Sequence, residues 1–560
     1  MSDCSSNHAI CSEQLSSTLP KRLLDIHAHP IRLVETKDVP KNEISPYASL
    51  SHCWGTKELL KTTLETFLDH RKEVPWPQLS RTFQDAVQLT RELGLHYLWI
   101  DSLCIIQNDK KDWEEEAKNM GTIYENAEIV LSAARSKDGS DGLFTKRAPA
   151  FIVAEMTGSN GKKQTVYGAG EHREVKFVLS DGDEFVAIVR DKPHHAQWDD
   201  LDMIAQNAEG NPLLDRAWAF QESLLAARIV HFAEHEMIFE CKTGRRCECT
   251  VLDDSTSPME RNLKHQFAAI TTQPDSKAKA LRFWHQVIET YNSRKLTFET
   301  DRMIALSSAA QRIQKIVGGS YAFGLFAKDI PRSLLWYAVN PGKRQMNTER
   351  ANRIPTWSWT SVIPEQGAAP HIRYMWHVYV PALTGYPHTI VETCAGFMNK
   401  SQETANGDGN TSTDILKQGY LVIAAPIITA TLKINIYTEN KFIIRNDAAM
   451  MDFSAMMRKF DYTVTRGDQS NGFEADIILH EGPDRMESDA EVYLMAVGRS
   501  VRQTHFENLI VLKPISVDEN MRNCVYERIG MMFAMKSSDL FGSEWSGFEA
   551  RSTPSTKYSI

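Results

Sequence analysis

The sequence predicts an α/β domain with a parallel sheet in its N-terminal part, followed by a mostly helical region and a β-rich C-terminal module. Between about residues 45 and 240, short apolar runs alternate with amphipathic helical patterns, an order typical of layered α/β domains. Helical patterns dominate from about 280 to 345. After residue 417, short alternating runs recur, as in β-rich modules: "YLVIAA", "ADIILH", "EVYLMAVG" and "NLIVLK".

The first elements of the α/β domain follow one another closely. "PYASLSHCWG" predicts a short strand that ends in a turn at Gly55. "SRTFQDAVQLTRELG" predicts a helix, because its apolar residues recur at helical spacing and Gly94 is a typical C-terminal stop. "LHYLWIDSLCII" is an apolar run flanked by turns, typical of a strand buried on both faces of a parallel sheet. A helix containing "KKDWEEEAKNM" and a strand in "AEIVLSAA" follow.

The remaining patterns divide the chain further. "DRAWAFQESLLAARIVHF" predicts a helix that leads into a strand, and "EVKFVLSD" and "EFVAIVR" predict strands within a polar insertion. "IPTWSWTSV" is typical of a strand. We therefore expect an N-terminal extension (1–44), an α/β domain (45–240) with an insertion at about 150–205, a helical or mixed region (241–400), a flexible loop or linker (401–416) and a β-rich C-terminal region (417–540).

Composition restricts the partners and the compartment. The 560 residues carry a formal net charge of −9, which argues against broad contact with nucleic acid or an acidic membrane surface. The N-terminal segment lacks the basic start and apolar core of a secretory signal, and "GYLVIAAPIITATL" is too short to span a membrane. We expect a cytoplasmic protein with no membrane span and no nucleic-acid partner.

The cysteines indicate a reduced protein. There are nine, an odd number, without the density of a disulfide scaffold. The cluster "CKTGRRCEC" contains Cys241, Cys247 and Cys249, with His231 and His235 nearby. Because zinc sites usually need a second ligand pair at suitable spacing, we expect no metal site here and interpret these residues as buried or surface thiols.

One of the three consecutive glutamates in "KKDWEEEAKNM" is predicted to face the protein interior. At about 100° per residue, Glu116 falls with Trp113 and Met120 on the apolar side of the helix, whereas Glu114 and Glu115 fall on the other side. A carboxylate facing an apolar layer has a raised pKa unless donors or cations stabilise its charge. Such a group is a candidate general acid or base, or a stabiliser of developing positive charge. The alternative is a structural glutamate, hydrogen-bonded to backbone or to a hydroxyl.

A ligand-binding crevice is expected beside Glu116, because doubly wound sheets bind ligands at the carboxyl ends of their strands, where the strand order reverses. Asp101 would either hold ribose hydroxyls or cap the turn after its strand. His52 and Cys53 are adjacent on a strand and point to opposite faces, which argues against a nucleophile–base pair. The residues expected to line the crevice are Ser51, His52, Trp54, Asp101 and Ser102.

Glu222 is a second acidic candidate. It lies four residues after Trp218 on the predicted helix of "DRAWAFQESLLAARIVHF". A second catalytic acid and a structural role are both compatible with this position. We favour the structural role, in which Glu222 pairs with Arg216 or Arg228.

These segments resemble the fungal heterokaryon-incompatibility (HET) domain family. The resemblance rests on "YASLSHCWG", "TFQDAVQLTRELGLHYLWIDSLCIIQNDKKDWEEEAKNMGTIYENA" and "LLDRAWAFQESLLAARIVHF", and extends to "LTFETDRMIALSS", "IPTWSWTSV" and "YERIGM". Ser49 and Phe239 stand where alanine and tryptophan are usual in the family. The resemblance implies a cytosolic fungal protein of non-self recognition, in which incompatible partners trigger growth arrest and cell death.

HET domains are in turn similar to TIR domains, which implies a flavodoxin/TIR-like parallel sheet. "SLSH" resembles the first TIR strand, and the spacing of Trp113 and Glu116 resembles that at the NAD-cleaving site. The resemblance implies that Glu116 is catalytic and that the protein self-associates or responds to a protein trigger. It implies a binding site for NAD or a related nucleotide that consists of Ser51, His52, Trp54, Gly55, Asp101, Ser102 and Trp113.

The dinucleotide would be a substrate and not a cofactor. No GxGxxG motif follows the first strand, so stable dinucleotide binding for hydride transfer is not supported. We therefore expect no bound cofactor. The alternative to an NAD hydrolase is a non-catalytic module that oligomerises and signals cell death through a partner.

Overall fold

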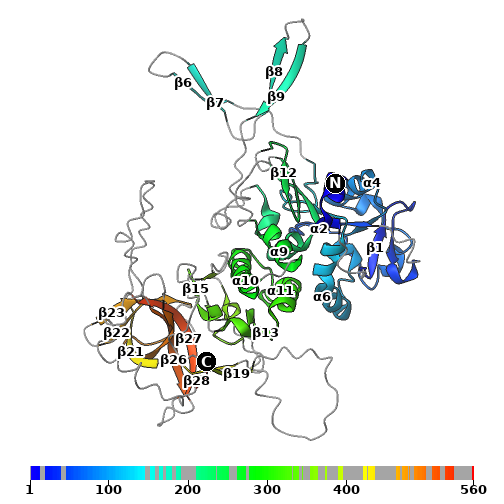
Figure 1. Ribbon diagram of the computed structural model, residues 1–560. Coiled ribbons are helices and arrows are strands. Elements are labelled where there is room, and N and C mark those ends of the chain that lie inside the picture. The colour runs from blue at the N-terminus through cyan, green and yellow to red at the C-terminus, as the bar shows by residue number, and fades with distance from the viewer. Residues whose placement is uncertain are drawn as a thin grey trace. The chain divides into compact units, whose positions relative to one another are not determined.

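The computed structural model of the chain divides into two compact units (Figure 1). The first comprises Met1–Phe283 and Arg294–Arg312, and the second comprises Trp284–Ser293 and Ile313–Ile560. The domain boundaries expected from the sequence stay predictions. The structure describes residues 2–12, 19–39, 46–144, 210–234, 236–250, 262–272, 276–330, 332–339, 354–363, 372–374, 427–434, 462–466, 469–476, 479, 485–499, 507–516 and 524–534, and the backbone of strands at 152–157, 163–167, 172–178, 184–190, 343–344, 389–394, 420–424 and 558–559.

An eight-stranded sheet organises the first unit, in the order β12-β11-β10-β5-β3-β4-β1-β2. The central strands β10, β5, β3 and β4 are parallel, whereas the strands at both edges are antiparallel. Numbered along the chain, the central strands have the order 2-1-3-4, as in flavodoxin-like sheets. The strands are β1 (Arg22–Asp25), β2 (Arg32–Glu35), β3 (Tyr47–Ser51), β4 (Tyr97–Trp99), β5 (Ile129–Ser132), β10 (Arg228–Phe232), β11 (Met237–Cys241) and β12 (Arg245–Cys247). The predicted α/β domain with a parallel central sheet is confirmed.

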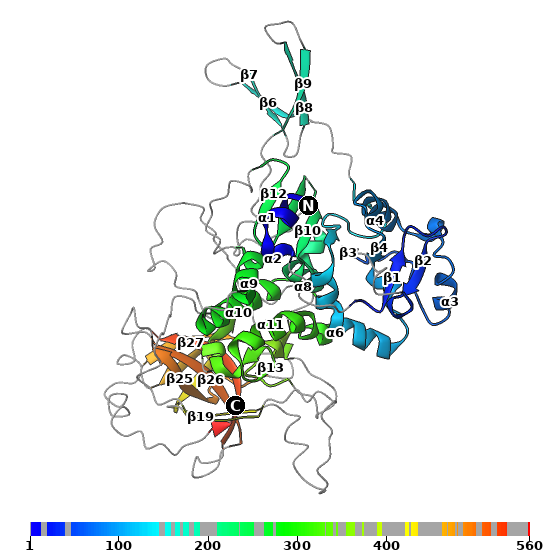
Figure 2. The ribbon, with the colours of Figure 1, turned by 45° about the vertical axis from the view of Figure 1, so that its right-hand side comes forward.

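Helices α4 (Arg81–Glu92) and α6 (Lys110–Asn126) connect the central strands. The α4 connection runs from β3 to β4, and the α6 connection returns across β3 to β5. Because such crossovers are right-handed, two that run in opposite directions place their helices on opposite faces of the sheet. In Figure 2 the strands lie between α4 and α6. Val87 from α4 and Ile123 from α6 are both buried in the core that surrounds these strands.

The run "LHYLWIDSLCII" forms a shorter strand than predicted. β4 ends at Trp99, and Asp101–Cys104 form a helical turn, α5. The backbone N–H of Ser102 donates to Asp101 Oδ1 at 2.7 Å, a side-chain contact that favours a turn over an extended strand. The prediction of one continuous strand is therefore wrong, although Asp101 does follow the carboxyl end of a buried strand as expected.

Several further elements belong to the first unit. Figure 2 shows the two N-terminal helices beside β10 and β12. The strands predicted in "EVKFVLSD" and "EFVAIVR" are confirmed as the antiparallel hairpin β8–β9, and a second hairpin, β6–β7, precedes it. The helices are α1 (Ser2–Asn7), α2 (Ala9–Ser12), α3 (Phe67–His70), α8 (Ala217–Leu225) and α9 (Leu263–Thr272), and the hairpin strands are β6 (Ile152–Thr157), β7 (Lys163–Tyr167), β8 (His172–Val178) and β9 (Glu184–Arg190).

Along the middle of the chain two helices are followed by short strands, so the mostly helical character expected from the sequence is not clearly shown. The helices are α10 (Lys277–Asn292) and α11 (Ser307–Val317), and the strands are β13 (Tyr321–Ala322), β14 (Leu325–Phe326), β15 (Trp336–Ala338), β16 (Lys343–Arg344), β17 (Val362–Ile363) and β18 (Ile372–Tyr374). The strand predicted in "IPTWSWTSV" is wrong for most of its length, because Trp359–Ser361 form a 3-10 turn before β17. The Ser358 hydroxyl accepts from the N–H of Thr360 at 3.0 Å and stabilises this turn.

A curved ten-stranded sheet forms the β-rich part of the second unit, as predicted (Figure 1). Its long strands β25, β26 and β27 pair in antiparallel register around a core that includes Leu494, Val511 and Met532. Of the predicted strand "ADIILH", only Ala475 lies in a strand among the described residues. The strands are β19 (Thr389–Cys394), β20 (Tyr420–Ala424), β21 (Ile427–Ile434), β22 (Tyr462–Arg466), β23 (Gln469–Gly472), β24 (Glu474–Ala475), β25 (Glu491–Arg499), β26 (Glu507–Ser516), β27 (Cys524–Ala534) and β28 (Tyr558–Ser559).

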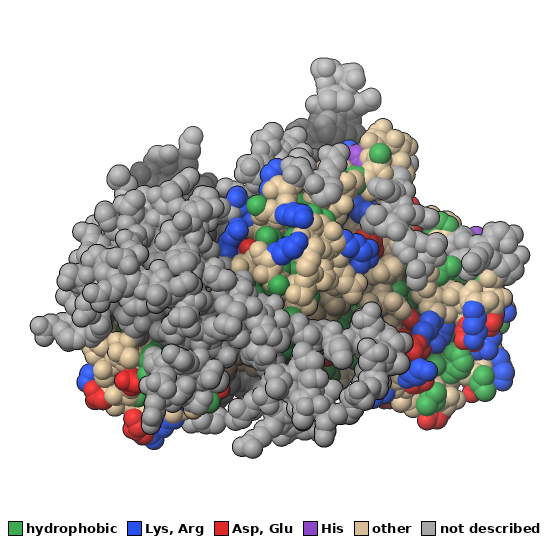
Figure 3. All heavy atoms as spheres, turned by 60° about the horizontal axis from the view of Figure 1, so that its bottom comes forward, with side chains coloured by type: hydrophobic (Ala, Val, Ile, Leu, Met, Phe, Trp, Pro, Cys, Tyr) green, Lys and Arg blue, Asp and Glu red, His purple; other side chains and the backbone are tan. Residues whose placement is uncertain are grey.

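The described surface carries both signs of charge. Basic and acidic side chains lie next to one another at the right of Figure 3. Arg71, for example, pairs with Glu35 at 3.3 Å and with Asp38 at 2.9 Å. Within the described parts of the chain, every helix is too short or too polar to cross a membrane.

Candidate functional site

The carboxyl ends of β3 and β5 form the point where the strand order of the sheet reverses. Ser51, the last residue of β3, lies opposite Ser132, the last residue of β5. The chain leaves β3 for β4 on one side and later enters β5 on the other, which is the topological switch point at which open α/β sheets bind ligands. Polar side chains from several elements gather here. We refer to them as the switch-point cluster, which consists of Ser51, His52, Trp54, Asp101, Tyr124, Arg216 and Glu222.

Three of the predicted binding residues contact one another in this cluster. The indole N–H of Trp54 donates to Asp101 Oδ2 at 2.8 Å. His52 Nε2 lies 3.7 Å from Asp101 Oδ1 and has no hydrogen-bond partner. Burial lowers the pKa of His52, so its imidazole is neutral near pH 7. Trp54 and Asp101 are half-buried and reach the surface, whereas His52 lies behind them.

The acidic group of the cluster is Glu222, from α8. The hydroxyl groups of Ser51 and Tyr124 act on its carboxyl group and favour the ionised form. Tyr124 also donates to the carbonyl of Leu50 at 3.0 Å, so its hydroxyl is held beside the end of β3. Burial raises the pKa of Glu222 to about 7, although the Ser51 hydroxyl and the charge of Arg216 act in the opposite direction. The group therefore titrates in the range in which acid–base and electrostatic catalysts operate.

Arg216 supplies a positive charge to the cluster. Its guanidinium donates to the carbonyl of His52, and its charge acts against the burial that raises the pKa of the Cys53 thiol. The side chain is half-buried and precedes α8, which carries Glu222. An arginine beside a carboxylate, a neutral imidazole and an indole can hold a phosphate group, because its planar fork of donors matches phosphate oxygens.

Glu116 turns inward, as the helical projection predicts. It is only 1% exposed, and burial raises its pKa to about 7. Its charged neighbours are Arg22, Lys21 and Asp112, at the start of β1 and of α6. The Arg22 guanidinium donates to Asp112, and Lys21 lies 3.0 Å from the same carboxylate. Glu116 Oε2 has no hydrogen-bond partner, so one oxygen of this buried carboxyl group is unsatisfied.

The other predicted binding residues differ in accessibility. Gly55 is exposed and has a φ of +67°, and a Cβ there would overlap Asp138 and lie 3.1 Å from the carbonyl of Lys137. The turn after β3 therefore requires glycine for conformation and for close packing. Ser102 is completely buried, and its hydroxyl has no hydrogen-bond partner. Trp113 is half-buried and packs against the core of the sheet.

Sequence reasoning did not assign Tyr124, Arg216 and Glu222 to a site. It considered Glu222 and favoured a pair with Arg216 or Arg228. The charge of Arg216 does act on Glu222, whereas Arg228 pairs with Glu128 at 3.0 Å. One signal was available: Glu222 is the one charged residue of the mostly apolar helix "AWAFQESLL". Such a residue inside an apolar helix is either paired or functional.

Together, the parallel central sheet and the polar cluster at its switch point define an α/β domain of the kind that binds ligands at the carboxyl ends of its strands. Residues 47–222 match the family model described as Heterokaryon incompatibility protein (HET). Residues 47–222 of the chain therefore form a heterokaryon-incompatibility (HET) domain. The matched region begins with the first residue of β3 and ends at Glu222, so it contains the whole switch-point cluster. No curated protein and no solved structure matches the chain.

Proposed function

We propose that the HET domain binds NAD or a related nucleotide at the switch-point cluster and hydrolyses its nicotinamide–ribose bond, as part of regulated cell death in non-self recognition. One observation carries this proposal: Glu222, whose pKa burial raises to about 7, is a buried carboxyl group whose pKa is influenced by Ser51 at the carboxyl end of the central strand. A titratable carboxyl group at the switch point of a doubly wound sheet favours a catalytic centre over a purely structural contact.

The chemistry needs an ionised carboxylate. When the C–N bond breaks, nicotinamide leaves with the electron pair and the ribose becomes an oxocarbenium ion. The negative charge of Glu222 stabilises this cation, water adds to the ribose, and a proton is released. The products are nicotinamide and ADP-ribose. Since only the ionised carboxylate stabilises the cation, activity should rise as the pH increases through about 7, the pKa of Glu222.

The residues around Glu222 can bind the other parts of a dinucleotide, namely its pyrophosphate, its ribose hydroxyls and its bases. Arg216 supplies positive charge for the pyrophosphate. Asp101, half-buried and held by the Trp54 indole, offers an acceptor for ribose hydroxyls. The Trp54 ring offers a surface on which nicotinamide or adenine can stack, and Lys61 lies 5.2 Å from the centroid of that ring.

Two buried carboxyl groups compete for the catalytic role. The Trp113–Glu116 spacing favours Glu116, whereas the contacts with Ser51 favour Glu222. The test is NAD consumption by the full chain over a range of protein concentrations, with and without a crowding agent that promotes assembly. Glu222→Gln should lower the rate by roughly 100-fold or more, the usual effect of removing one electrostatic stabiliser. Glu116→Gln should retain most of the activity, and the exposed Glu114→Gln is the matched control.

Each outcome decides between the assignments. Loss of activity in Glu116→Gln with retention in Glu222→Gln would return the catalytic role to Glu116. If the wild-type chain leaves NAD unchanged in every assembly state, NAD hydrolysis is excluded.

A non-catalytic interaction module is the second candidate function. It is favoured because several side chains of the switch-point cluster are almost completely buried. Ser51 is 2% exposed and His52 is 4% exposed, so a ligand needs some side chains to move before it reaches them. In this version the domain binds a protein trigger or a second copy and signals by assembly. Thermal melts with and without NAD discriminate, because a ligand that binds only the native state raises the melting temperature. An unchanged melt together with concentration-dependent assembly would support the module.

A further inference from the structure

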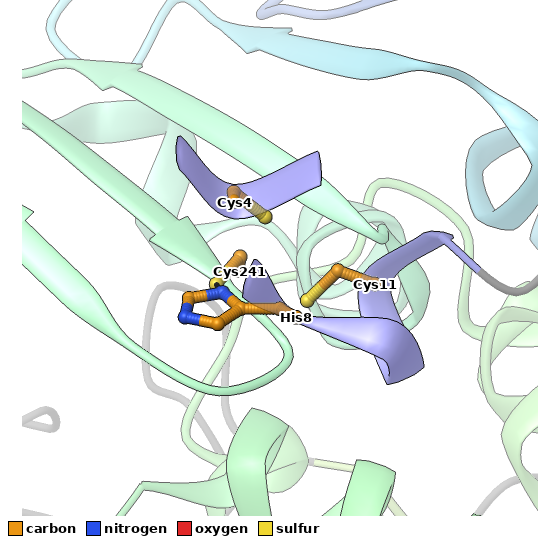
Figure 4. A group of neighbouring side chains, drawn as sticks. All are labelled: Cys4, His8, Cys11 and Cys241. Carbon is orange, nitrogen blue, oxygen red and sulfur yellow. Dashed lines mark hydrogen bonds between the residues drawn. The ribbon is translucent and has the colours of Figure 1, made fainter. Parts of the chain in front are cut away.

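The N-terminal helices and strand β11 bring four sulfur and nitrogen side chains together (Figure 4). Cys4, His8 and Cys11 come from α1, α2 and the residue between them, and Cys241 is the last residue of β11. Their ligand atoms all lie within 4.8 Å of one another, and the Cys241 thiol lies 3.5 Å from His8 Nδ1. In the sequence, Cys241 lies more than 200 residues from the other three, so no local sequence motif indicates that the four residues form a group.

The spacing of the first three ligands suits a single metal ion. The N–H of His8 donates to the carbonyl of Cys4, and the N–H of Cys11 donates to the carbonyl of His8, both at 3.0 Å. Residues three and four apart in such helical turns lie on the same face. Three ligands therefore lie on one face of a short helical segment, and the fourth, Cys241, lies at the end of strand β11.

The distances fit tetrahedral zinc. A Zn–S bond of about 2.3 Å places two ligands of a tetrahedral site roughly 3.8 Å apart. The ligand atoms all lie within 4.8 Å of one another, with 3.5 Å between Cys241 Sγ and His8 Nδ1, so only small side-chain adjustments are needed to reach this value. Three cysteines and one histidine form a common ligand set for structural zinc, and soft thiolates disfavour magnesium and calcium.

The packing around the four residues indicates what such an ion would do. Cys4, Cys11 and Cys241 are 3%, 2% and 1% exposed, and they form a small cluster with Ile10 and Phe239 beside them. Helices of six and four residues are not stable alone. With so little apolar area to hold the segment in place, a metal–thiolate centre would supply the missing free energy of folding.

The surroundings also balance the charge. Zinc with three thiolates and a neutral imidazole carries a net charge of −1. The buried ammonium of Lys264 interacts electrostatically with Cys241 and Cys11, and Arg228 does so with Cys4. The Thr243 hydroxyl lies 3.4 Å from the Cys241 thiol, where it can donate to a metal-bound sulfur, as outer-sphere donors do in such centres.

We propose that Cys4, His8, Cys11 and Cys241 bind a structural Zn²⁺ ion that attaches the N-terminal segment to the edge of the HET-domain sheet. With four protein ligands the site is closed, so the ion has no open position for a substrate. The ligands all lie outside the matched region 47–222, so the site belongs to this chain and not to the domain as the family model describes it. The group Glu236, Cys247 and Cys249 offers three ligands among the described residues and carries no proposal.

The metal content of the full chain tests the proposal. The chain is purified without a metal-binding tag, dialysed against buffer with equimolar zinc and then against buffer alone, and measured by plasma mass spectrometry. We expect about one zinc ion per chain. Cys241→Ser and Cys11→Ser should reduce this value at least tenfold. Cys247→Ser is the matched control, a buried cysteine of the neighbouring strand, and should retain the zinc.

A spectroscopic measurement keeps the proposal testable if the serine variants do not fold. Co²⁺ bound in place of zinc should give the intense visible bands of tetrahedral thiolate coordination, and His8→Cys should shift them towards those of a four-thiolate centre while retaining the metal. Wild-type chain that holds no zinc and no cobalt, retention of zinc by Cys241→Ser, or a Cys11–Cys241 disulfide in peptide mass spectra would overturn the proposal.

Discussion

The substitution Glu222→Gln should stabilise the first unit, and by an amount that depends on pH. Burial raises the pKa of Glu222 to about 7 from its usual 4.5. A carboxyl group whose pKa is raised in the folded state is bound to its proton more tightly there than in the unfolded state. Ionisation of Glu222 therefore lowers the free energy of unfolding progressively above pH 4.5, and the loss is complete above about pH 7.

The magnitude follows from the two pKa values. One pKa unit corresponds to 1.36 kcal/mol. The difference between 4.5 and about 7 therefore corresponds to roughly 3 kcal/mol at alkaline pH. Glutamine has the same shape and no charge, and it retains one oxygen that can accept from Ser51 or Tyr124. The variant should match the wild type near pH 4.5 and exceed its stability by up to roughly 3 kcal/mol near pH 8, equivalent to a rise on the order of 5–10 °C in Tm.

Differential scanning calorimetry of the full chain at several pH values measures this difference in the transition of the first unit. Glu114→Gln serves as the control, because its side chain is half exposed and its change should be small at every pH. A Glu222→Gln effect of constant size between pH 4.5 and pH 8 would refute the reasoning. In that case the carboxyl group is ionised in the folded state without a cost, and the predicted pH dependence of NAD cleavage also loses its basis.

Three further predictions concern other parts of the chain. Glu116→Gln should also stabilise the first unit only at higher pH, because burial raises the pKa of Glu116 to about 7, and urea unfolding at two pH values would show it. Gly121→Ala should lower stability by about 1–3 kcal/mol, since a Cβ there overlaps Ser308, and Ser308→Gly should restore part of the loss in thermal melts. Arg528→Met should lower the stability of the second unit by about 3–5 kcal/mol, because it leaves the fully buried Asp476 without its partner at 2.8 Å; the double variant Arg528→Met/Asp476→Leu should recover most of the loss in calorimetry.

Local periodicity was a reliable guide to individual elements. The apolar stripe of "KKDWEEEAKNM" predicted that Glu116 turns inward, and its side chain is 1% exposed. The same reasoning located α4 and the parallel strands β3 and β5. It failed in "LHYLWIDSLCII", where apolar composition alone could not reveal that Asp101 starts a helical turn by accepting from the next N–H.

The residues that surround Glu222 could not be predicted from local patterns, because they are set by the order of the strands in the sheet. Ser51, Tyr124 and Glu222 come from a strand and two helices that lie far apart in the sequence, and they meet because the strand order reverses beside β3. From the sequence, Glu116 is the catalytic candidate, whereas a structural role is favoured for Glu222. Only the order of the strands decides which of them lies beside Ser51.

The sequence by itself determined most of the secondary structure of the HET domain, its layered α/β class and the inward orientation of Glu116, because these follow from residue spacing within single elements. Tertiary structure alone decided which carboxyl group accompanies Ser51 and which cysteine joins Cys4, His8 and Cys11. Such contacts join residues more than a hundred positions apart, and the free energy that selects them comes from packing of the whole sheet and not from any local pattern.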